Sequence, residues 1–246
     1  MSCRNVSPIR RDYLSGTDWD LRHRTSFDSC RFGVHGGRHS EEFNTAFHAA
    51  CGRIATYVHA HTPLSWLLDW VGDIGVTVCK AGFHGEGRAF DLSVVRFTNG
   101  AAIDTNTHWN PASPCNGGSL LNRRLYVGLA ASARQFVGTV LTAWYNADHR
   151  NHIHFDNGVG VVPIRTGSRT DATLVQAACN YLSGESLVID GAWGPLTEAA
   201  YLRLLTKLRM RCRTPKTNTS HAVRLLDLIA TTGLQNRAAG AFTDVC

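Results

Sequence analysis

The chain has 246 residues, of which 43% are hydrophobic and 18% charged, and its formal net charge is +6. This composition is that of a globular protein of one large or two small domains, and it excludes a collagen-like or disordered chain. No apolar run reaches the roughly 18 residues that a membrane-spanning helix needs, so we expect no membrane span. The basic charge suits an anionic polymer, either cell wall or nucleic acid, and equally a basic surface without a partner.

Residues 1–40 are rich in Gly, Ser, Arg and His without a sustained period, and we predict an irregular N-terminal lead-in. From residue 41, apolar side chains recur at steps of three and four, which predicts a helix. We expect this helix to begin at Ser40 and the two glutamates that follow it, and to end near Thr62. Its buried face is expected to carry Phe43, Phe47, Cys51, Ile54 and Val58.

Two strands follow, over 74–83 and 87–97, joined by the glycine-rich turn "HGEG" at 84–87. After a long loop at 99–118, residues 119–146 indicate a helix that breaks near Gly138, and "NHIHFDNGVGVV" at 151–162 indicates another strand. The fold class we expect is therefore α+β, with a small antiparallel sheet and helices that carry the candidate site.

After residue 163 the pattern changes to three short helices, over 171–182, 195–212 and 220–234. We predict a domain boundary near 163–170, which gives a lead-in at 1–40, a first domain at 41–165 and a small helical domain at 166–246.

The cysteines are even in number and form no CxxC pair, which favours disulfides in an oxidising compartment over a zinc ribbon. The eight candidates are Cys3, Cys30, Cys51, Cys79, Cys115, Cys179, Cys212 and Cys246. The first residues, "MSCRNVSPIRRDYLSG", contain no apolar segment of a classical signal peptide. We therefore expect export by another route, such as a secretion machine or lysis, unless a signal has been removed.

Two histidine motifs carry the candidate chemistry. His84 and Asp91 lie seven residues apart across the predicted turn, and "DHRNHIHFD" at 148–156 follows some 60 residues later. His152 and His154 would face the same side of a strand, because side chains alternate with a period of two. Either motif alone is more common as a surface or core feature, but together they predict the three N or O ligands of a catalytic zinc site.

These motifs resemble the extensin-like C-terminal family and, more broadly, the zinc peptidases grouped around D-Ala-D-Ala carboxypeptidases and penicillin-insensitive murein endopeptidases. The resemblance covers roughly residues 40–158. It implies that His84, Asp91 and His154 bind Zn²⁺ and that His149 and His152 assist catalysis. The chain departs from many relatives at Asn151, where they have an acidic general base, and at Gly82, where they have a small polar residue.

The departure at Asn151 leaves three candidates for the general base. His149 is favoured because an unperturbed imidazole pKa near 6.5 suits proton transfer at neutral pH, and Asp148 and Glu86 are weaker candidates. His152 would stabilise an oxyanion. Arg88 is a candidate for binding a substrate carboxylate, with a solvated arginine as the alternative.

"LVIDGAWGPLTEAAYLRLL" at 188–206 resembles the peptidoglycan-binding type 1 module, a small three-helix domain. Gly191 permits a turn after Asp190, and Pro195 suits the first turn of a helix. Trp193 either packs into the core or offers a face to sugar, so it is a candidate substrate-binding residue.

Both resemblances imply peptidoglycan as the partner and a zinc peptidase of stem peptides or cross-links as the function. Such an enzyme would work in the bacterial periplasm or cell wall as a phage lysin or secreted antibacterial effector. Further partners would then be an immunity protein or secretion machinery. One alternative is a non-catalytic zinc-containing wall-binding protein. Another is a nucleic-acid binder, which we do not expect because the chain lacks an aromatic-interleaved basic stripe.

Overall fold

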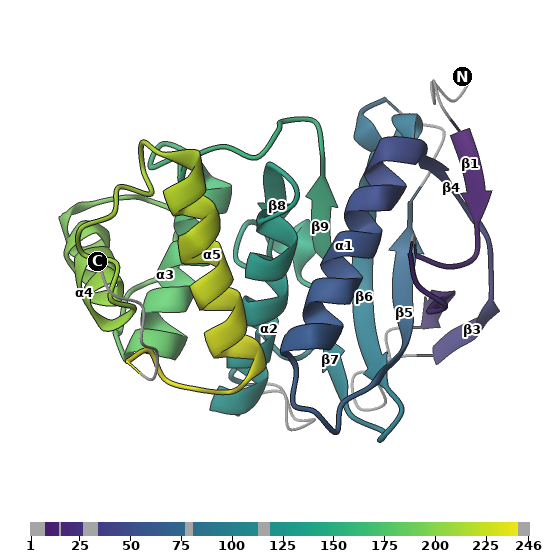
Figure 1. The fold of residues 1–246 in the computed structure, drawn as a ribbon, viewed down its shortest axis with the longest axis horizontal. Helices are drawn as coiled ribbons and strands as arrows, with labels where there is room; N and C mark the ends of the chain where they lie inside the picture. The colour runs from purple at the N-terminus through teal and green to yellow at the C-terminus, as the bar shows by residue number, and fades with distance from the viewer. Residues whose placement is uncertain (1–7, 15, 27–33, 77–80, 113–118, 241–246) are drawn as a thin grey trace.

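The computed structural model describes residues 8–14, 16–26, 34–76, 81–112 and 119–240 (Figure 1). In this part of the chain the α-helices are α1 (Thr45–His61), α2 (Leu120–Arg134), α3 (Arg169–Ser183), α4 (Pro195–Lys207) and α5 (Thr219–Leu234). Two 3-10 helices are η1 (Phe83–Glu86) and η2 (Ala147–His149). The strands are β1 (Pro8–Arg11), β2 (Asp20–Ser26), β3 (Val34–Arg38), β4 (Glu41–Asn44), β5 (Leu68–Gly75), β6 (Ala89–Phe97), β7 (Ala102–Asp104), β8 (Thr139–Leu141) and β9 (Ile153–Asp156).

The main sheet has seven strands in the order β3-β2-β5-β6-β9-β8, with β7 also paired to β6. All of its pairs are antiparallel except β2 with β5, and β1 and β4 form a separate two-stranded sheet. The protein is thus mixed α and β as predicted, but the prediction of a small antiparallel sheet was wrong. It missed β1, β2 and β3, which lie in the segment expected to be irregular. It also missed β7, in the expected loop at 99–118, and β4 and β8, in segments expected to be helical.

The strands β2 and β3 escaped prediction because their polar residues hide the period of two. His23, Arg24 and Arg38 are strand residues, and Arg24 is only 2% exposed because its guanidinium bonds Asp104 at 3.2 Å. A buried arginine with a carboxylate partner gives the same burial pattern as an apolar residue. Hydropathy alone does not find such strands.

Helix α1 begins later than predicted. Asn44, not Ser40, is its N-cap: the Asn44 side chain accepts hydrogen bonds from the backbone N–H groups of Ala46 and Phe47. The two glutamates at 41 and 42 belong to β4, where they pair with β1. The predicted apolar face of the helix is confirmed for Phe47, Cys51, Ile54 and Val58, which are all at most 4% exposed. Phe43 is also buried, but it belongs to β4 and not to the helix.

Four further boundaries differ from prediction. The strand expected at 151–162 is β9, which covers only Ile153–Asp156. The strand expected at 74–83 lies earlier in the chain, as β5, which begins at Leu68 and ends at Gly75. Residues 77–80 of the expected strand lie outside the described residues. The helix expected to break near Gly138 ends at Arg134, and Thr139–Leu141 form β8. Strand β6 and the three C-terminal helices lie where the sequence predicts them, although α4 ends at Lys207.

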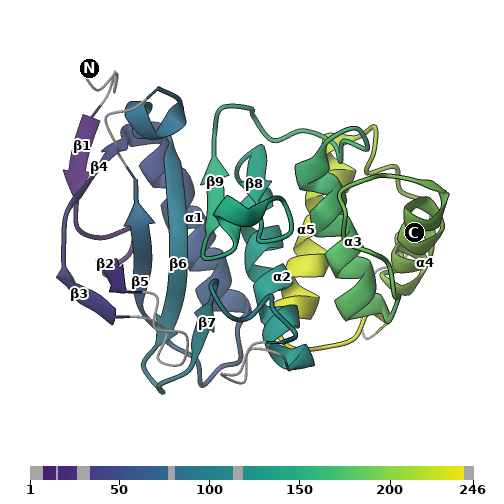
Figure 2. The same ribbon diagram turned by 180° about the vertical axis from the view of Figure 1, so that it is seen from behind.

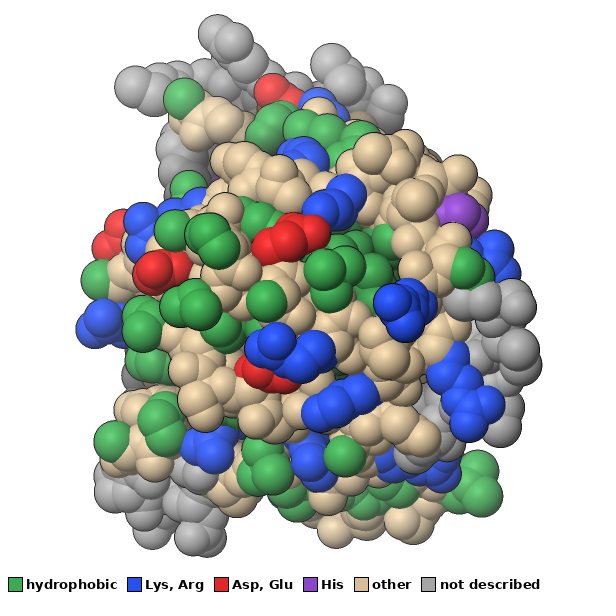
Figure 3. Space-filling model, turned by 90° about the vertical axis from the view of Figure 1, so that its left-hand side faces the viewer, with side chains coloured by type: hydrophobic (Ala, Val, Ile, Leu, Met, Phe, Trp, Pro, Cys, Tyr) green, Lys and Arg blue, Asp and Glu red, His purple; other side chains and the backbone are tan. Residues whose placement is uncertain are grey.

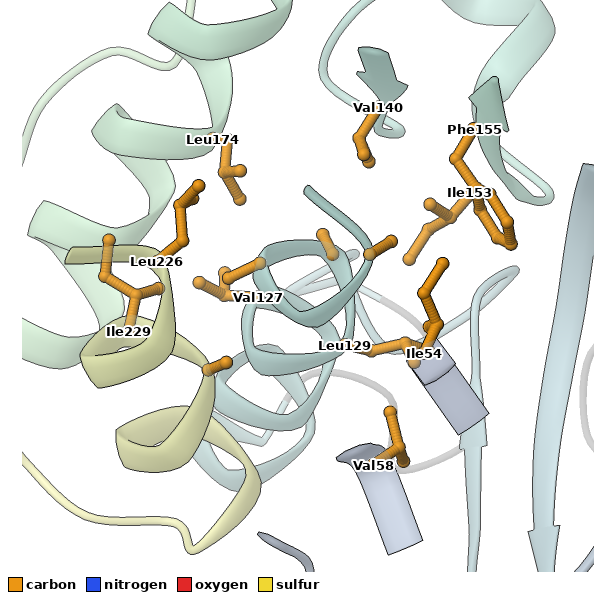
Figure 4. Packing of buried hydrophobic residues seen from close by; sticks show 14 of the residues in the cluster. Ile54, Val58, Val127, Leu129, Val140, Ile153, Phe155, Leu174, Leu226 and Ile229 are labelled. Atoms are coloured by element: carbon orange, nitrogen blue, oxygen red, sulfur yellow. The ribbon is translucent and has the colours of Figure 1, made fainter. Parts of the chain in front are cut away.

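Helices α1 and α2 cover one face of the main sheet (Figure 1), and the opposite face is turned to the viewer in Figure 2. Residues 125–134 of α2 are all buried, which is the pattern of a helix enclosed on every side. Figure 4 shows why: Leu129 lies toward Ile54 of α1, whereas Val127 lies toward Leu226 and Ile229 of α5.

The C-terminal helices pack closely on α2. A Cβ atom on Gly128 of α2 would lie 2.7 Å from the backbone nitrogen of Leu234, and one on Gly233 of α5 would lie 2.5 Å from the carbonyl oxygen of Arg124. Any larger residue at this crossing would force the two helices apart. The buried residues of both halves form one hydrophobic cluster, and the boundary near 163–170 stays a prediction.

The cysteines do not all form disulfides. Cys51 and Cys179 are buried free thiols, so their prediction as disulfide candidates was wrong. Burial raises the pKa of both thiols, that of Cys179 to about 12, which makes them unreactive packing residues. Cys212 is disulfide-bonded. The other candidates, Cys3, Cys30, Cys79, Cys115 and Cys246, lie outside the described residues.

Candidate metal centre

Three separate elements bring His84, Asp91 and His154 together. His84 lies on η1, Asp91 on β6 and His154 on β9, and the antiparallel register places Asp91 directly opposite His154. Cross-strand partners project from the same face of a sheet. The turn of η1 then brings His84 back over this pair.

The ligand atoms of the three residues converge on one point. His84 Nε2 lies 3.2 Å from Asp91 Oδ1 and 3.3 Å from His154 Nδ1, and the His154 nitrogen lies 2.8 Å from the same carboxylate oxygen. The side chains of His84, Asp91 and His154 are 8%, 20% and 12% exposed, so the point they enclose is open to solvent on one side. These three residues, which we call the first cluster, could hold a metal ion.

The tautomer of His84 is fixed by the backbone. Its Nδ1 lies 2.7 Å from the carbonyl oxygen of Val76, to which it donates. In the neutral imidazole the Nε2 atom is then an acceptor, and it faces Asp91 Oδ1 and His154 Nδ1. A cation between these atoms removes the repulsion of their lone pairs.

His154 is oriented by a second carboxylate. Its Nε2 lies 3.3 Å from Asp156 Oδ2, which favours a proton on that nitrogen and turns Nδ1 toward the other two ligands. Metal-binding histidines commonly donate their other ring N–H to a carboxylate or a backbone carbonyl. Asp156 plays that part for His154, and the Val76 carbonyl plays it for His84.

The charges of the first cluster are coupled. Burial lowers the pKa of His154, but the hydrogen bonds to Asp156 and Asp91 outweigh it and raise that pKa to about 9. For Asp91, burial raises the pKa, and the hydrogen bonds to His154 and His84 bring it far below its usual range. Without a metal ion, a proton on His154 therefore compensates the carboxylate charge.

His152 lies beside the first cluster. Its Nε2 is 3.4 Å from Asp91 Oδ1, and its Nδ1 is 2.7 Å from the side-chain oxygen of Asn151. Burial lowers the pKa of His152 to about 4, so the ring is neutral at pH 7. Asn151 therefore orients the His152 ring, a role that the sequence did not indicate.

His149 completes this group of histidines from η2. Its ring centroid lies 5.0 Å from that of His152 and 5.8 Å from that of His154. The Nδ1 atom is 2.5 Å from the side-chain oxygen of Asn146, the N-cap of η2. Burial lowers the pKa of His149, so a neutral ring whose Nδ1 donates to Asn146 keeps Nε2 as an acceptor.

The weaker candidates for a general base lie outside this group. Asp148 is exposed. Glu86 is 2.9 Å from Arg88 Nη1, and neither acid belongs to a metal-binding group among the described residues. Gly82 precedes η1 with a φ of 97°, a conformation that glycine adopts without strain.

Arg88 joins the two segments that carry the ligands. Its guanidinium bonds the Asn157 side chain and backbone oxygens, each at 2.9 Å, in addition to Glu86, and it lies over the Phe83 ring. These contacts tie η1 to the end of β9 and favour a positioning role. Carboxylate binding by Arg88 stays a prediction.

The predicted turn before α4 is built around a buried glutamine. The Gln176 side chain bonds Asp190 and Thr197, and it accepts from the Gly191 N–H at 2.9 Å. Gly191 has a φ of 77°, and Pro195 opens α4 as predicted.

Trp193 packs edge-on against Tyr201, and its Nε1 donates to Glu198 at 2.6 Å. These contacts give the ring a packing role. Sugar binding by Trp193 stays a prediction.

Sequence reasoning missed a second group of possible ligands, His23, His39, Glu41 and Asp73. Their spacing in the chain gives no motif, since they come from three segments over 50 residues. Asp156, Val76 and Asn146 were missed as partners of the histidines. Of these, only Asp156 had a sequence signal, namely its place two residues after His154 on a strand.

Residues 76–161 match the family described as Extensin-like protein C-terminus. The matched segment contains the first cluster together with His149 and His152, so the predicted resemblance to this family is confirmed over these residues. No curated protein and no solved structure matches the chain. The wider likeness to zinc peptidases and to the peptidoglycan-binding module stays a prediction.

Among the described residues, no helix is both long and apolar enough to cross a membrane.

Proposed function

We propose that the protein is a zinc-dependent peptidase that hydrolyses amide bonds in the stem peptides or cross-links of peptidoglycan. The observation that carries this proposal is the convergence of His84 Nε2, Asp91 Oδ1 and His154 Nδ1 at separations of 2.8–3.3 Å. Two ligands of a tetrahedral zinc ion with bonds of about 2.0–2.1 Å lie about 3.3 Å apart. Two nitrogens and one oxygen with an open side also fit a catalytic zinc site.

A bound zinc ion would polarise the scissile carbonyl and lower the pKa of water to about 7. His84, Asp91 and His154 would hold it, with Val76 and Asp156 fixing the two rings.

His149 is the residue we assign as general base. Burial lowers the pKa of His149, which favours the neutral ring, and its hydrogen bond to Asn146 leaves Nε2 free to accept a proton from water and deliver it to the leaving amine. Asn151 cannot take this role because an amide side chain has no proton-accepting group in the relevant pH range.

His152 is assigned to the developing oxyanion. In the structure the side-chain oxygen of Asn151 faces Nδ1, so donation from Nε2 by the neutral ring requires the Asn151 amide to turn and present its nitrogen to Nδ1. A positioned donor of this kind typically contributes a rate factor of about 10²–10³.

Peptidoglycan as the substrate rests on two supports. The first is the resemblance of the histidine motifs to wall peptidases, and the second is the resemblance of residues 188–206 to a wall-binding module. The end of the molecule formed by the C-terminal helices carries dispersed Lys and Arg side chains among hydrophobic ones, with acidic side chains between some of them (Figure 3). A basic surface favours an anionic polymer.

The test is digestion of purified sacculi, followed by mass spectrometry of the released muropeptides. A chelator should abolish release and added Zn²⁺ should restore it. Release that neither treatment changes would exclude a zinc peptidase, and the mass of the products identifies the bond that is cut.

A second candidate function is a zinc-containing wall-binding protein without turnover, which Asn151 in the place of an acidic base favours. It requires sacculus binding with no product from the parent protein. His149→Ala would then leave binding unchanged, and no variant would lose an activity.

A further inference from the structure

A second cluster of side chains that could hold a metal ion lies where β2 and β5 of the main sheet meet β4. We use this name for His23 on β2, His39 and Glu41 around the start of β4, and Asp73 on β5. One ligand atom from each residue lies within 4.8 Å of the others. None of these residues belongs to the first cluster or to the segment 84–91 and 149–156 that builds it.

Strand register places the two clusters on opposite faces of the sheet. His23 is the direct neighbour of Asp73 on the parallel pair β2 and β5, and Asp73 is opposite Leu92 on β6. Leu92 lines the core with α1 residues such as Ile54. Asp91, the next residue on β6, points to the other face because side chains alternate along a strand.

Asp73 is the centre of the second cluster. Its side chain is fully buried, with Oδ1 3.0 Å from His23 Nδ1 and Oδ2 2.8 Å from His39 Nε2. Glu41 Oε1 lies 3.8 Å from His39 Nδ1. A buried carboxylate must be compensated by positive charge, which either two imidazolium rings or one metal ion can supply.

The cluster is also accessible. The side chains of His23, His39 and Glu41 are 42%, 26% and 15% exposed, so an ion can reach Asp73 from solvent. Two imidazoles and two carboxylates suit a divalent first-row transition ion better than Mg²⁺ or Ca²⁺, which prefer oxygen ligands.

We propose that the second cluster binds one divalent transition metal ion, with Zn²⁺ as the probe of choice, and that the ion fastens the β3–β4 connection to β2 and β5. The ligands come from three segments that only tertiary structure brings together, so binding stabilises the packing of β2 and β4 against β5. Val76, whose carbonyl oxygen is the backbone partner of His84, directly follows the last residue of β5. The second ion therefore supports the strand that leads to the backbone partner of His84 in the first cluster. The proposal of this second site does not depend on the proposed function.

The test is the zinc content of the full chain after saturation with Zn²⁺ and removal of free ions, measured by elemental analysis. We expect two zinc ions per wild-type chain, one in His39→Gln, one in His154→Ala and none in the double variant. His221→Gln on α5, far from both clusters in the fold, is the matched control and should keep two. If His39→Gln does not fold by circular dichroism, His23→Gln gives the same test at a more exposed position.

A wild-type chain with one zinc ion that His39→Gln retains and His154→Ala loses would overturn the second site and leave the proposed function standing. One zinc ion that His39→Gln loses and His154→Ala retains would support the second site and contradict the first. Zinc should also raise the melting temperature of His154→Ala more than that of the double variant. Equal shifts would count against the second site.

Discussion

The two clusters use the same side chains in different arrangements. In the first cluster a single oxygen, Asp91 Oδ1, lies 2.8–3.4 Å from nitrogens of the two cluster histidines and of the neighbouring His152. In the second cluster Asp73 divides its two oxygens between two histidines. The first arrangement concentrates ligands and proton carriers on one open point, which catalysis requires. The second satisfies each oxygen separately, which suits a site that only stabilises the fold.

The largest expected difference between the clusters is in activity. Asp91→Ala should lower muropeptide release by more than about 10⁴-fold, because it removes the ligand on which all three nitrogens converge and with it the chemistry of the ion. Asp73→Ala should lower stability and retain measurable activity at low temperature. The measurement is the rate of muropeptide release by each variant, compared at an equal fraction of folded protein. Equal losses of activity in Asp91→Ala and Asp73→Ala would mean that the clusters do not differ in role.

A substitution of His149, which lies on η2 beside the first cluster, tests catalysis separately from metal binding. His149→Ala should lower kcat by about 10²-fold or more, the usual contribution of a general base, with the zinc content unchanged. Asn146→Ala, which removes only the partner of His149 Nδ1, should give a smaller loss. If His149→Ala also loses zinc, the residue is a ligand and the assignment as base is wrong.

These residues also show what the sequence could predict. Two short motifs were enough for the first cluster, because strand alternation places His152 and His154 on one face and the turn after His84 is visible in its glycines. Asp73 and His23 were not predictable as a pair, since their contact depends on the parallel register of β2 and β5. The polar residues of β2 and β3 hide the strands that create this register.

The helical part was easier to predict because its period of 3.6 is local. The positions of α3 and α5 follow from their own apolar residues. The packing of α5 on α2 depends on Gly128 and Gly233, which the sequence does not pair with each other. The prediction of Cys51 and Cys179 as disulfide candidates was wrong, because apolar helix faces place both as free thiols in the core.

Replacing Asp156, the carboxylate that orients the ligand His154, should have a smaller effect. Asp156→Asn should weaken zinc binding by about 10-fold to 100-fold, because His154 loses the charged acceptor that orients its ring. Competition with a zinc indicator measures the change. The same substitution should leave the second cluster unaffected, so the affinity of only one of two sites should shift.

The pH dependence of the first cluster provides the smallest effect. The pKa of His154 is raised to about 9 from the usual 6.5, so protonated His154 stabilises the metal-free fold below pH 6.5, and this contribution is lost as the pH rises through 9. The free energy of unfolding of the metal-free wild type, minus that of His154→Ala, should therefore fall between pH 6.5 and 9.5 by about 1–3 kcal/mol. A difference that is flat over this range would contradict the coupling of His154 to Asp91 and Asp156.

The central claim is that His84, Asp91 and His154 hold one zinc ion. Anomalous diffraction at the zinc absorption edge, from crystals of the wild-type protein grown with stoichiometric Zn²⁺, tests it most directly. The account predicts an anomalous peak about 2.0–2.2 Å from His84 Nε2, Asp91 Oδ1 and His154 Nδ1. A peak bound by His149 and His152 instead, or no peak on this face of the sheet, would contradict it.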